Sequence, residues 1–325
     1  MNIVYQLALS ATICTLLLTG SILHPHTATA ATYYVATDGN DANQGTEERP
    51  FQTIRKGISV VKAGDTLYIK GGTYAEAIYS YNFSPFPTGT SWDNPVTIAS
   101  YPDETAVLAP DGGGTVIDMA DAHYVIFDRL VLDAGNTIYA MAVGSQGAHH
   151  IRFQNGEIKN AGGYENVELS GSFNEVIDSK IHDSQHSYGF YITGHDNLVD
   201  GNDIYNNAGY AVQIYDGSNS SDNHTVSNNK MWGNGFSRQE AAVTVNAGKD
   251  NFIYNNLIYD NWAGIDVLWR SPVSTRIDSN TIHNNRYGIL IGSESQGAII
   301  QNNILYQNAI AIEDHGIRTI LRDNS

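Results

Sequence analysis

One short pattern recurs along residues 174–308, and it decides the fold. Two copies read Val226-Ser227-Asn228-Asn229-Lys230-Met231 and Ile253-Tyr254-Asn255-Asn256-Leu257-Ile258. In each copy one apolar residue stands five positions before another, and an asparagine usually stands two positions before the second. These asparagines are Asn202, Asn229, Asn256, Asn280 and Asn302. Successive copies are 22 to 27 residues apart, and a period of about 20–30 residues is typical of a solenoid of repeated coils.

Each repeat also contains a third apolar run, for example residues 190–192, 243–245 and 289–291. These runs alternate apolar and polar residues, as half-buried strands do. Three short strands cannot enclose a core alone, but stacked coils share a continuous apolar interior. The pattern therefore predicts an all-β fold, a right-handed parallel β-helix solenoid, the hand following the general rule for parallel crossovers. The asparagines are expected to stack as a ladder of side-chain amides in the turns.

The two ends of the predicted solenoid differ. Ile54, Ile58 and Val61 share one face of a short predicted helix near the N-terminus. A terminal coil exposes its apolar interior unless something covers it, so this helix is predicted to be an N-terminal capping helix. Nothing after Leu321 offers a second cap. Because open strand edges invite association, the sequence predicts self-association through the C-terminal coil.

The N-terminus has the composition of an export signal. Residues 1–30 contain no Asp, Glu, Lys or Arg, residues 7–18 are mostly apolar, and Ala28-Thr29-Ala30 offers a small-residue cleavage site. This predicts a signal peptide over residues 1–30, followed by a single domain over residues 31–325. Cys14 lies in the signal, so no disulfide is expected in the mature chain. The protein is expected to be secreted, periplasmic or at the cell surface.

The charge of the chain limits its partners. With 34 acidic and 17 basic residues, its net charge is −17, which argues against nucleic acid because phosphates require a basic surface. No later segment is long and apolar enough for a membrane span. A polysaccharide is the expected partner. An acidic polysaccharide would need a local basic groove or bridging Ca²⁺, whereas a neutral one would need neither.

Alternation in the third strand predicts an outward row with one side chain per coil. The row is Ala142, Glu168, Tyr191, Gln213, Thr244, Asp266 and Leu290. Its middle coils combine polar and aromatic residues, the mixture that carbohydrate sites use. The candidate substrate-binding residues are Glu168, Gln213, Tyr215, Trp262 and Trp269.

Two reactions are consistent with this face. Lyases and epimerases remove the proton next to a uronate carboxylate, so they need a cation and a base. Arg238 and Arg270 are the candidate cations. The candidate acid or base residues are Tyr191, Tyr215, His186 and His195. A hydrolase instead needs two carboxyl groups about 5–10 Å apart, which Glu168, Asp216, Glu240 and Asp266 offer. A non-catalytic glycan-binding or matrix protein is the rival of another class.

Two other aromatic groups stand outside this row. Residues 80–92 interrupt the repeat and contain Tyr81, Phe83, Phe86 and Trp92. They form either a loop packed on the coils or an aromatic flap beside a sugar groove. The second strands carry an outward stack, expected to stabilise the surface, of His182, Tyr205, Trp232, Tyr259 and His283.

The N-terminal part carries motifs that link the chain to a known group of proteins. They are Gly45-Thr46, Pro50-Phe51-Gln52-Thr53-Ile54, Gly64-Asp65-Thr66-Leu67-Tyr68-Ile69 and Gly72-Thr73-Tyr74. This opening resembles that of secreted parallel β-helix proteins of the pectate lyase-like superfamily, and most of all family-nine polysaccharide lyases. The resemblance implies cleavage of a uronic-acid-containing polysaccharide by β-elimination.

The family-nine resemblance also implies site residues. It implies Ca²⁺ held by aspartates of an Asp-Asp-Gly-Trp-Asp stretch, which aligns with Trp262-Ala263-Gly264-Ile265-Asp266 and keeps the last aspartate. It implies a lysine base in a Gly-Phe-Lys-Leu-Gly stretch, which aligns with Gly288-Ile289-Leu290-Ile291-Gly292 and has Leu290 at the lysine position. Asp216, Glu240 and Asp266 are the candidate Ca²⁺ ligands.

A second resemblance is to mannuronan C-5 epimerases. Tyr188-Gly189-Phe190 is similar to the start of their Tyr-Gly-Phe-Asp-Pro-His stretch, and Tyr191 and Thr193 stand where that stretch has Asp and His. His195 is the nearby candidate for the missing histidine. This resemblance implies epimerisation as an alternative to cleavage.

Overall fold

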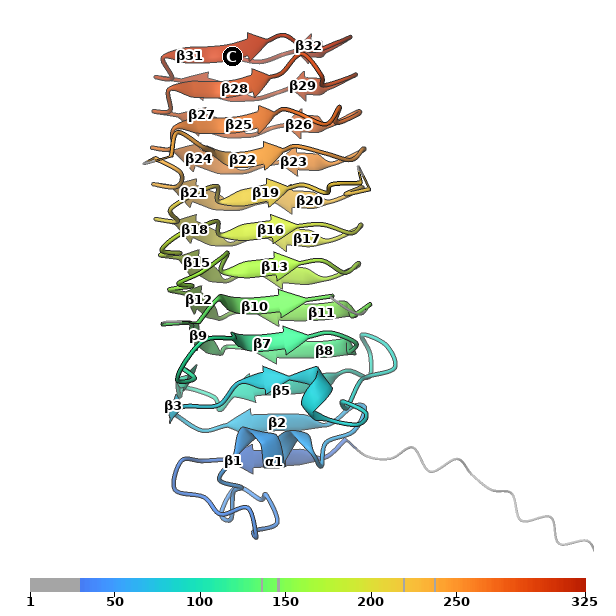
Figure 1. The fold of residues 1–325 in the computed structure, drawn as a ribbon, viewed down its shortest axis with the longest axis vertical. Helices are drawn as coiled ribbons and strands as arrows, with labels where there is room; N and C mark the ends of the chain where they lie inside the picture. The colour runs from blue at the N-terminus through green and yellow to red at the C-terminus, as the bar shows by residue number, and fades with distance from the viewer. Residues whose placement is uncertain (1–29, 136, 145–146, 219, 237) are drawn as a thin grey trace, which may run out of the picture.

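The computed structural model describes residues 30–325 except 136, 145–146, 219 and 237. The chain winds into a column of stacked coils, with β1 near one end and β32 at the other (Figure 1). Each full coil contributes one strand to each of three parallel sheets. The predicted all-β parallel solenoid is confirmed. The predicted signal peptide lies outside the described residues except for Ala30.

Sheet A, as we name it, has 12 strands within the described residues. They are β1 (Thr32–Val35), β2 (Thr66–Ile69), β5 (Val96–Ser100), β8 (His123–Asp128), β11 (His149–Gln154), β14 (Glu175–Ile177), β17 (Leu198–Asp200), β20 (Thr225–Ser227), β23 (Phe252–Tyr254), β26 (Arg276–Asp278), β29 (Ile299–Gln301) and β32 (Ile320–Arg322). Neighbours in this order pair in parallel, as coils stacked in chain order require.

Sheet B follows sheet A within each coil and has 10 strands in the described part of the chain. They are β3 (Gly72–Tyr74), β6 (Ala106–Leu108), β9 (Val131–Asp133), β12 (Glu157–Lys159), β15 (Lys180–His182), β18 (Asp203–Tyr205), β21 (Lys230–Trp232), β24 (Leu257–Tyr259), β27 (Thr281–His283) and β30 (Ile304–Tyr306). The predicted aromatic stack runs along its exterior, with near-parallel neighbouring rings such as Tyr205 and Trp232, whose centroids are 4.5 Å apart.

Sheet C completes each coil and also has 10 strands among the described residues. They are β4 (Ile78–Tyr79), β7 (Thr115–Met119), β10 (Tyr139–Val143), β13 (Val167–Leu169), β16 (Phe190–Ile192), β19 (Val212–Ile214), β22 (Ala241–Val245), β25 (Ala263–Val267), β28 (Tyr287–Ile291) and β31 (Ile310–Asp314). These strands contain the predicted outward row.

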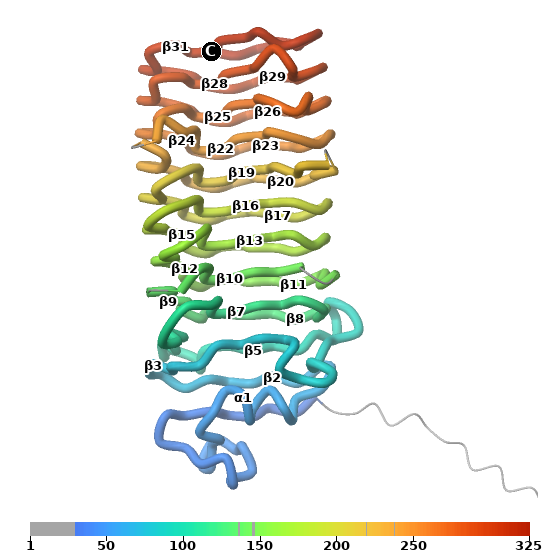
Figure 2. Tube along the Cα trace, in the orientation of Figure 1, coloured from blue at the N-terminus to red at the C-terminus, as the bar shows by residue number. Residues whose placement is uncertain are grey.

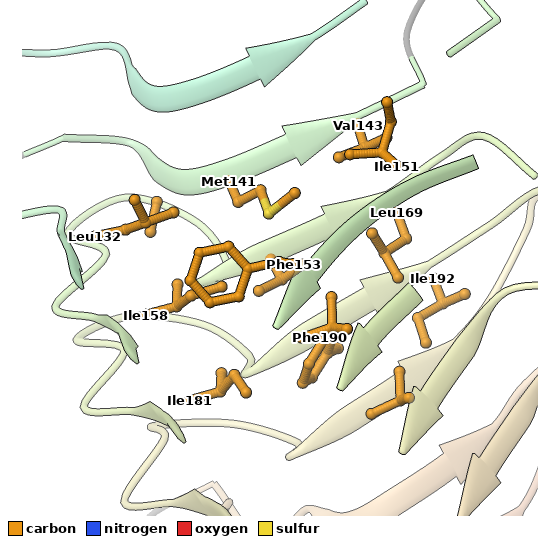
Figure 3. Packing of buried hydrophobic residues seen from close by; sticks show 14 of the residues in the cluster. Leu132, Met141, Val143, Ile151, Phe153, Ile158, Leu169, Ile181, Phe190 and Ile192 are labelled. Atoms are coloured by element: carbon orange, nitrogen blue, oxygen red, sulfur yellow. The ribbon is translucent and has the colours of Figure 1, made fainter. Parts of the chain in front are cut away.

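Alternate side chains of all three sheets fill one interior. Figure 3 shows Phe153 from sheet A, Ile158 from sheet B, and Phe190 from sheet C within it. All three are fully buried. Burial of apolar surface contributes roughly 25 cal/mol per Å², and each coil shares that surface with the coils on both sides. Figure 2 shows how closely one coil repeats the path of the next.

The predicted asparagine ladder runs between sheets A and B. Asn256 is representative: its side-chain NH₂ donates to Val226 O at 2.9 Å and to Asn280 Oδ1 at 3.0 Å. Its own Oδ1 accepts from the backbone N–H and the side-chain NH₂ of Asn229. The prediction of Asn302 is wrong, because Asn303 continues the ladder from Asn280.

The last coil is therefore shifted by one residue from the predicted register. Ile282 pairs with Leu305 rather than with Ile304. Two consecutive asparagines and two consecutive apolar residues fit either register by sequence alone, and the bonds to Asn303 favour the observed one. A second ladder, between sheets B and C, was not predicted. Its members are Asn207, Asn234, Asn261, Asn285 and Asn308.

The two ends of the column differ in what covers them, which bears on the predicted capping helix and the predicted self-association. Helix α1 (Ile54–Ile58) contacts β1 and β2, and Ile54, Ile58 and Val61 are buried. It ends before Val61 and is shorter than the predicted helical stretch. In the last coil, Ile310, Ile320 and Leu321 are exposed. In the part of the chain that the structure covers, no helix is both long and apolar enough to span a membrane.

Candidate functional site

The outward row of sheet C exists as predicted, and we call it the sheet C face. Glu168 pairs with Tyr191, Tyr191 with Gln213, and Thr244 with Asp266. The row begins earlier than predicted, because Asp118 pairs with Ala142. Since neighbouring strands are about 4.8 Å apart, these side chains form a continuous line across the coils.

Two carboxyl groups near the middle of this face are close enough to affect one another. Burial raises the pKa of Asp266 to about 7, a hydrogen bond from Thr244 opposes the rise, and the charge of Glu240 adds to it. Burial also raises the pKa of Glu240, against the lowering effects of Arg238 and the Tyr210 backbone. Burial therefore favours the protonated form of both carboxyl groups, and the charge of Glu240 adds to this effect at Asp266.

Aromatic rings stand beside this carboxyl pair. Tyr210, Ala241 and Ala263 form a small buried cluster outside the main core, against which Tyr188 and Trp262 pack. The Tyr188 and Tyr210 ring centroids are 5.1 Å apart. A side chain at Gly209 would lie 2.6 Å from Glu240 Oε2 and 2.5 Å from the Tyr188 ring. Glycine at this position thus allows Glu240 to approach the ring.

Three buried oxygens on this part of the face have no hydrogen-bond donor within the described protein. They are Gln213 Oε1, Glu240 Oε2 and Asp266 Oδ1. The Gln213 side chain is otherwise fixed, because its NH₂ donates to Asn246 Oδ1 at 3.0 Å. Leaving buried acceptors unpaired is unfavourable.

A second acidic group lies farther toward the N-terminal end. Glu165 is 6% exposed, and burial raises its pKa to about 7, with a smaller contribution from Glu168 and an opposing bond from Ser187. Glu168 itself accepts a hydrogen bond from Ser170 at 2.6 Å. Burial raises the pKa of Tyr191 to about 12, with contributions from Tyr215 and nearby acids. A neutral phenol of this kind donates hydrogen bonds and is a poor base at neutral pH.

The predicted arginines lie at the margins of the face. Arg238 is exposed, donates to the backbone carbonyl of His186, and lowers the pKa of Glu240. Arg270 donates to Gly217 O at 3.0 Å and lies over the Tyr215 ring, 5.4 Å from its centroid. His186 is also exposed, so the structure gives its imidazole no buried role.

The remaining candidates separate into different environments. Trp262 belongs to the aromatic cluster, and the Arg286 guanidinium lies 4.6 Å from the centre of its ring. Trp269 is 58% exposed. His195 is paired with Asp196 at 2.7 Å and lies in the turn from sheet C to sheet A. It follows the end of β16, beyond the alternating segment, and its catalytic role stays a prediction.

The three predicted calcium ligands have different partners. Burial raises the pKa of Asp216, but hydrogen bonds from Ser218 and Ser220 outweigh it and lower the pKa to about 2. Glu240 and Asp266 instead interact with one another. Among the residues that the structure describes, no three His, Cys, Asp or Glu side chains converge as metal ligands.

Glu165, Tyr188 and Tyr210 were not predicted as site residues. Each stands three positions before an outward residue of its strand, a spacing that strict alternation assigns to the interior. The residue between the tyrosines and their strands is small, Gly189 after Tyr188 and Ala211 after Tyr210. A Cβ added to Gly189 would lie 2.6 Å from Ala211 O, so the backbones of the two coils approach closely there. These small residues are the signal that could have pointed to the two tyrosines.

A comparison with known families follows from this architecture. The Pel9A-like, right handed beta helix region matches residues 33–319. The chain belongs to this family. Its right-handed β-helix and its place among pectate lyase-like proteins agree with the resemblance seen in the motifs. The Pel9A-like lysine position holds Leu290, which the structure places between Asp266 and Glu313 on the sheet C face.

Individual relatives range from uncharacterised to enzymatic. An uncharacterised protein of Bacillus subtilis, YwoF, is 25% identical over 85% of this chain and 68% of its own length. The pectate lyase PEL9 of Emericella nidulans is 33% identical over 34% of this chain and 26% of its own length. An alginate lyase from Paenibacillus sp. FPU-7 has a similar fold, with a TM-score of 0.68, 17% identity, and coverage of 88% of this chain and 99% of that one. The alginate lyase similarity shows a shared fold, in agreement with membership of the Pel9A-like family.

Proposed function

We propose that this protein is an exported enzyme that cleaves glycosidic bonds of a polysaccharide on the sheet C face, with Glu240 and Asp266 as the reacting carboxyl pair. The observation that carries the proposal is the pair itself. Two interacting carboxyl groups with raised pKa values each present an oxygen without a protein donor, beside aromatic rings. Two carboxyl groups in different surroundings are commonly the acid and base of glycoside hydrolysis.

The roles follow from the surroundings of each carboxyl group. Asp266 is the general acid, since its raised pKa keeps a proton available for the leaving oxygen near neutral pH. Glu240 is the general base or nucleophile, and the neighbouring Arg238 favours its ionised form. Gln213 and the Tyr188, Tyr210 and Trp262 rings position the sugar.

Hydrolysis fits this face better than β-elimination does. Elimination needs a cation against the uronate carboxylate and a base for the adjacent proton. The outward row from Tyr79 to Glu313 contains no lysine or arginine. Burial raises the pKa values of Tyr188 and Tyr191, which weakens both as bases.

β-Elimination is the second candidate, and membership of the Pel9A-like family supports it. In that reaction Arg238 would neutralise the uronate, and Ca²⁺ on Asp216, Glu240 or Asp266 would assist. The two reactions leave different products. Elimination produces an unsaturated sugar that absorbs near 235 nm, whereas hydrolysis produces reducing ends without that absorbance.

A product assay on the exported protein tests the proposal. Neutral and uronic-acid polysaccharides are incubated with the protein, with and without EDTA, and both signals are followed. Reducing ends without absorbance, insensitive to EDTA and lost in Asp266→Asn, are expected. Glu313→Gln is the matched control, because Glu313 lies in the same row and pairs with His315. Absorbance that EDTA removes would establish elimination instead, and inactivity on every substrate would favour a binding protein.

The carboxyl pair predicts a bell-shaped dependence of the cleavage rate on pH. Above pH 7 the rate should fall, because Asp266, whose pKa is raised to about 7, loses the proton that the leaving group requires. In acid the rate should fall as Glu240 becomes protonated. The profile of kcat/KM between pH 4 and 9 measures both limbs. A rate that rises steadily to pH 9 would contradict Asp266 as the acid and would favour a base-driven elimination.

We also propose that α1 acts as the N-terminal cap. Ile58 is 1% exposed and faces the first coil, so Ile58→Ala should cost about 2–5 kcal/mol of packing. Hydrogen exchange should accelerate in β1 and β2 before it does in β16. Arg55→Ala, on the exposed side of the same helix, is the control. Equal exchange in the two variants would contradict a capping role.

A further inference from the structure

Three aromatic residues occupy an unusual backbone position at the start of sheet A, in β8, in β11 and just before β14. Tyr124, His150 and Phe173 stand at equivalent places in successive coils, with φ angles of 51°, 55° and 57°. The next coils hold Asp196 and Asn223 there, with nearly the same φ. Asp and Asn tolerate the left-handed region, whereas bulky side chains rarely adopt it. Three consecutive coils therefore carry rings where this backbone conformation favours small polar residues.

These rings form a continuous line, which we call the aromatic ridge. The Tyr124 and His150 centroids are 4.6 Å apart, and those of His150 and Phe173 are 5.1 Å apart. His195 meets the Phe173 ring edge-on at 5.3 Å. Stacking offsets part of the backbone strain. Phe173 nevertheless stays 44% exposed, so its ring is not there to fill the core. Strained positions that keep an unfavourable residue are a mark of function.

A tryptophan from a different part of the chain joins the ridge. Trp92 ends the interrupting loop that contains the 3₁₀ helix η1 (Ser80–Asn82), and its ring packs edge-on against Tyr124 and His150. Arg152 lies 4.4 Å above the Trp92 ring and is paired with Glu175 at 2.6 Å. The loop was predicted either to pack on the coils or to form an aromatic flap beside a groove. Phe86 is buried, whereas Trp92 borders a surface hollow.

A hollow lies on each side of the ridge. One, of about 430 Å³, is lined by His149, Ser170 and His195 together with His150 and Phe173. The other, of about 340 Å³, lies between Trp92 and the polar side chains of Asp196 and Asn223. Both are in the size range of small-ligand sites, where aromatic walls and a few polar groups set orientation.

We propose that the aromatic ridge is a second carbohydrate-binding surface, which holds a neutral polysaccharide chain lying across Phe173 and Trp92. Sugar rings present C–H faces to aromatic groups and hydroxyls to acceptors, and the hollows supply Glu175, Asp196 and Asn223 as acceptors. The one arginine in contact with these rings is already paired with Glu175, and burial lowers the pKa values of His149 and His150. His195 is likewise paired with Asp196, so the described residues that line the two hollows offer an anionic polymer no unpaired cation.

The ridge borders the sheet C face without being part of it. Ser170 lines the larger hollow and also donates to Glu168 in the outward row. A chain held on the ridge would continue onto the face on which we propose cleavage. Binding here does not depend on that chemistry, because none of the ridge residues belongs to the Glu240 and Asp266 pair.

The strained backbone supplies a sharp test. Phe173→Asn removes the ring and places a residue that tolerates φ near 57°, so the variant should melt at a higher temperature while binding neutral polysaccharide at least about tenfold more weakly. Loss of binding then cannot be attributed to unfolding. The control is Phe252→Ala, a partly exposed ring on sheet A that lies outside the ridge.

Binding is measured by affinity electrophoresis of the full exported chain in gels containing soluble xyloglucan, galactan, β-glucan or polygalacturonate. Retardation by a neutral polymer, lost in Phe173→Asn and Trp92→Ala and kept in Phe252→Ala, is expected. Retardation by polygalacturonate alone, by no polymer, or equally in all variants would overturn the proposal. Cleavage of short oligosaccharides should survive Phe173→Asn, so an inactive wild-type protein would count against the proposed reaction and not against the ridge.

Discussion

Replacing Asp266 by asparagine is expected to abolish cleavage and at the same time to stabilise the protein at pH 8. The loss of rate should be about 10²–10⁴-fold, the usual contribution of a positioned proton donor. The stabilisation comes from removing a buried group that would otherwise ionise. Asp266 is 6% exposed, and burial raises its pKa to about 7. The raised pKa of Asp266 contributes to the free energy of unfolding. This contribution is complete below the pKa of an unfolded aspartate, about 3.9, and is lost as the pH rises through 7.

The asparagine side chain of this variant carries no charge at any pH, so the variant should not lose stability as the pH rises through 7. Thermal unfolding at pH 5 and pH 8, together with cleavage rates, measures both effects. Glu313→Gln removes a partly exposed carboxylate of the same row, and it should change neither the rate nor the pH dependence of unfolding. An active Asp266→Asn enzyme would remove this residue from the mechanism. An inactive variant that also melts earlier at pH 8 would indicate a structural role.

A single change of amide to acid in the ladder should have the largest effect on stability. In Asn256→Asp one carboxylate oxygen would still accept from Asn229, but the other would face the acceptors Val226 O and Asn280 Oδ1. Asn256 is 2% exposed, so water cannot relieve this repulsion. A buried charge without a partner costs about 3–5 kcal/mol. The penalty should shrink in acid, because a protonated carboxyl can donate as the amide does.

Asn255→Asp provides a matched control in the neighbouring residue. Asn255 is exposed and has a φ of 54°, a conformation that aspartate also tolerates. Chemical denaturation of both variants at pH 4 and pH 8 tests the ladder. If Asn256→Asp is no less stable than Asn255→Asp at pH 8, the ladder does not stabilise the fold as its geometry indicates.

Most of the fold could be predicted from the sequence repeat. Apolar spacing and turn asparagines determine which side chains enter the core, so the three strands per coil and the row from Glu168 to Asp266 could be predicted. Where two registers bury equally apolar residues, as at Ile304 and Leu305, periodicity could not choose. The hydrogen bonds of Asn303 distinguish them, and those bonds depend on the coil beneath.

The candidate site could be predicted only in part, for a similar reason. Asp266 and Gln213 follow strict alternation, so they were found. Tyr210 and Glu165 lie where the chain bends before the strand, and alternation says nothing about such positions. The ridge was missed because left-handed φ angles at Tyr124 and Phe173 contradict residue preference. A sequence pattern records preferences, and a strained residue is one that departs from them.

The unbroken passage of the second ladder through Asn207, Asn234 and Asn261 has a consequence for how such proteins can diversify. Asn234 is fully buried at the start of the segment leading to Glu240, yet it keeps both neighbouring coils at their ordinary spacing. The stacking of the coils therefore does not depend on the segment that follows this asparagine. Lineages can exchange, lengthen or graft these segments as modules, and a new specificity can arise without refitting the interior.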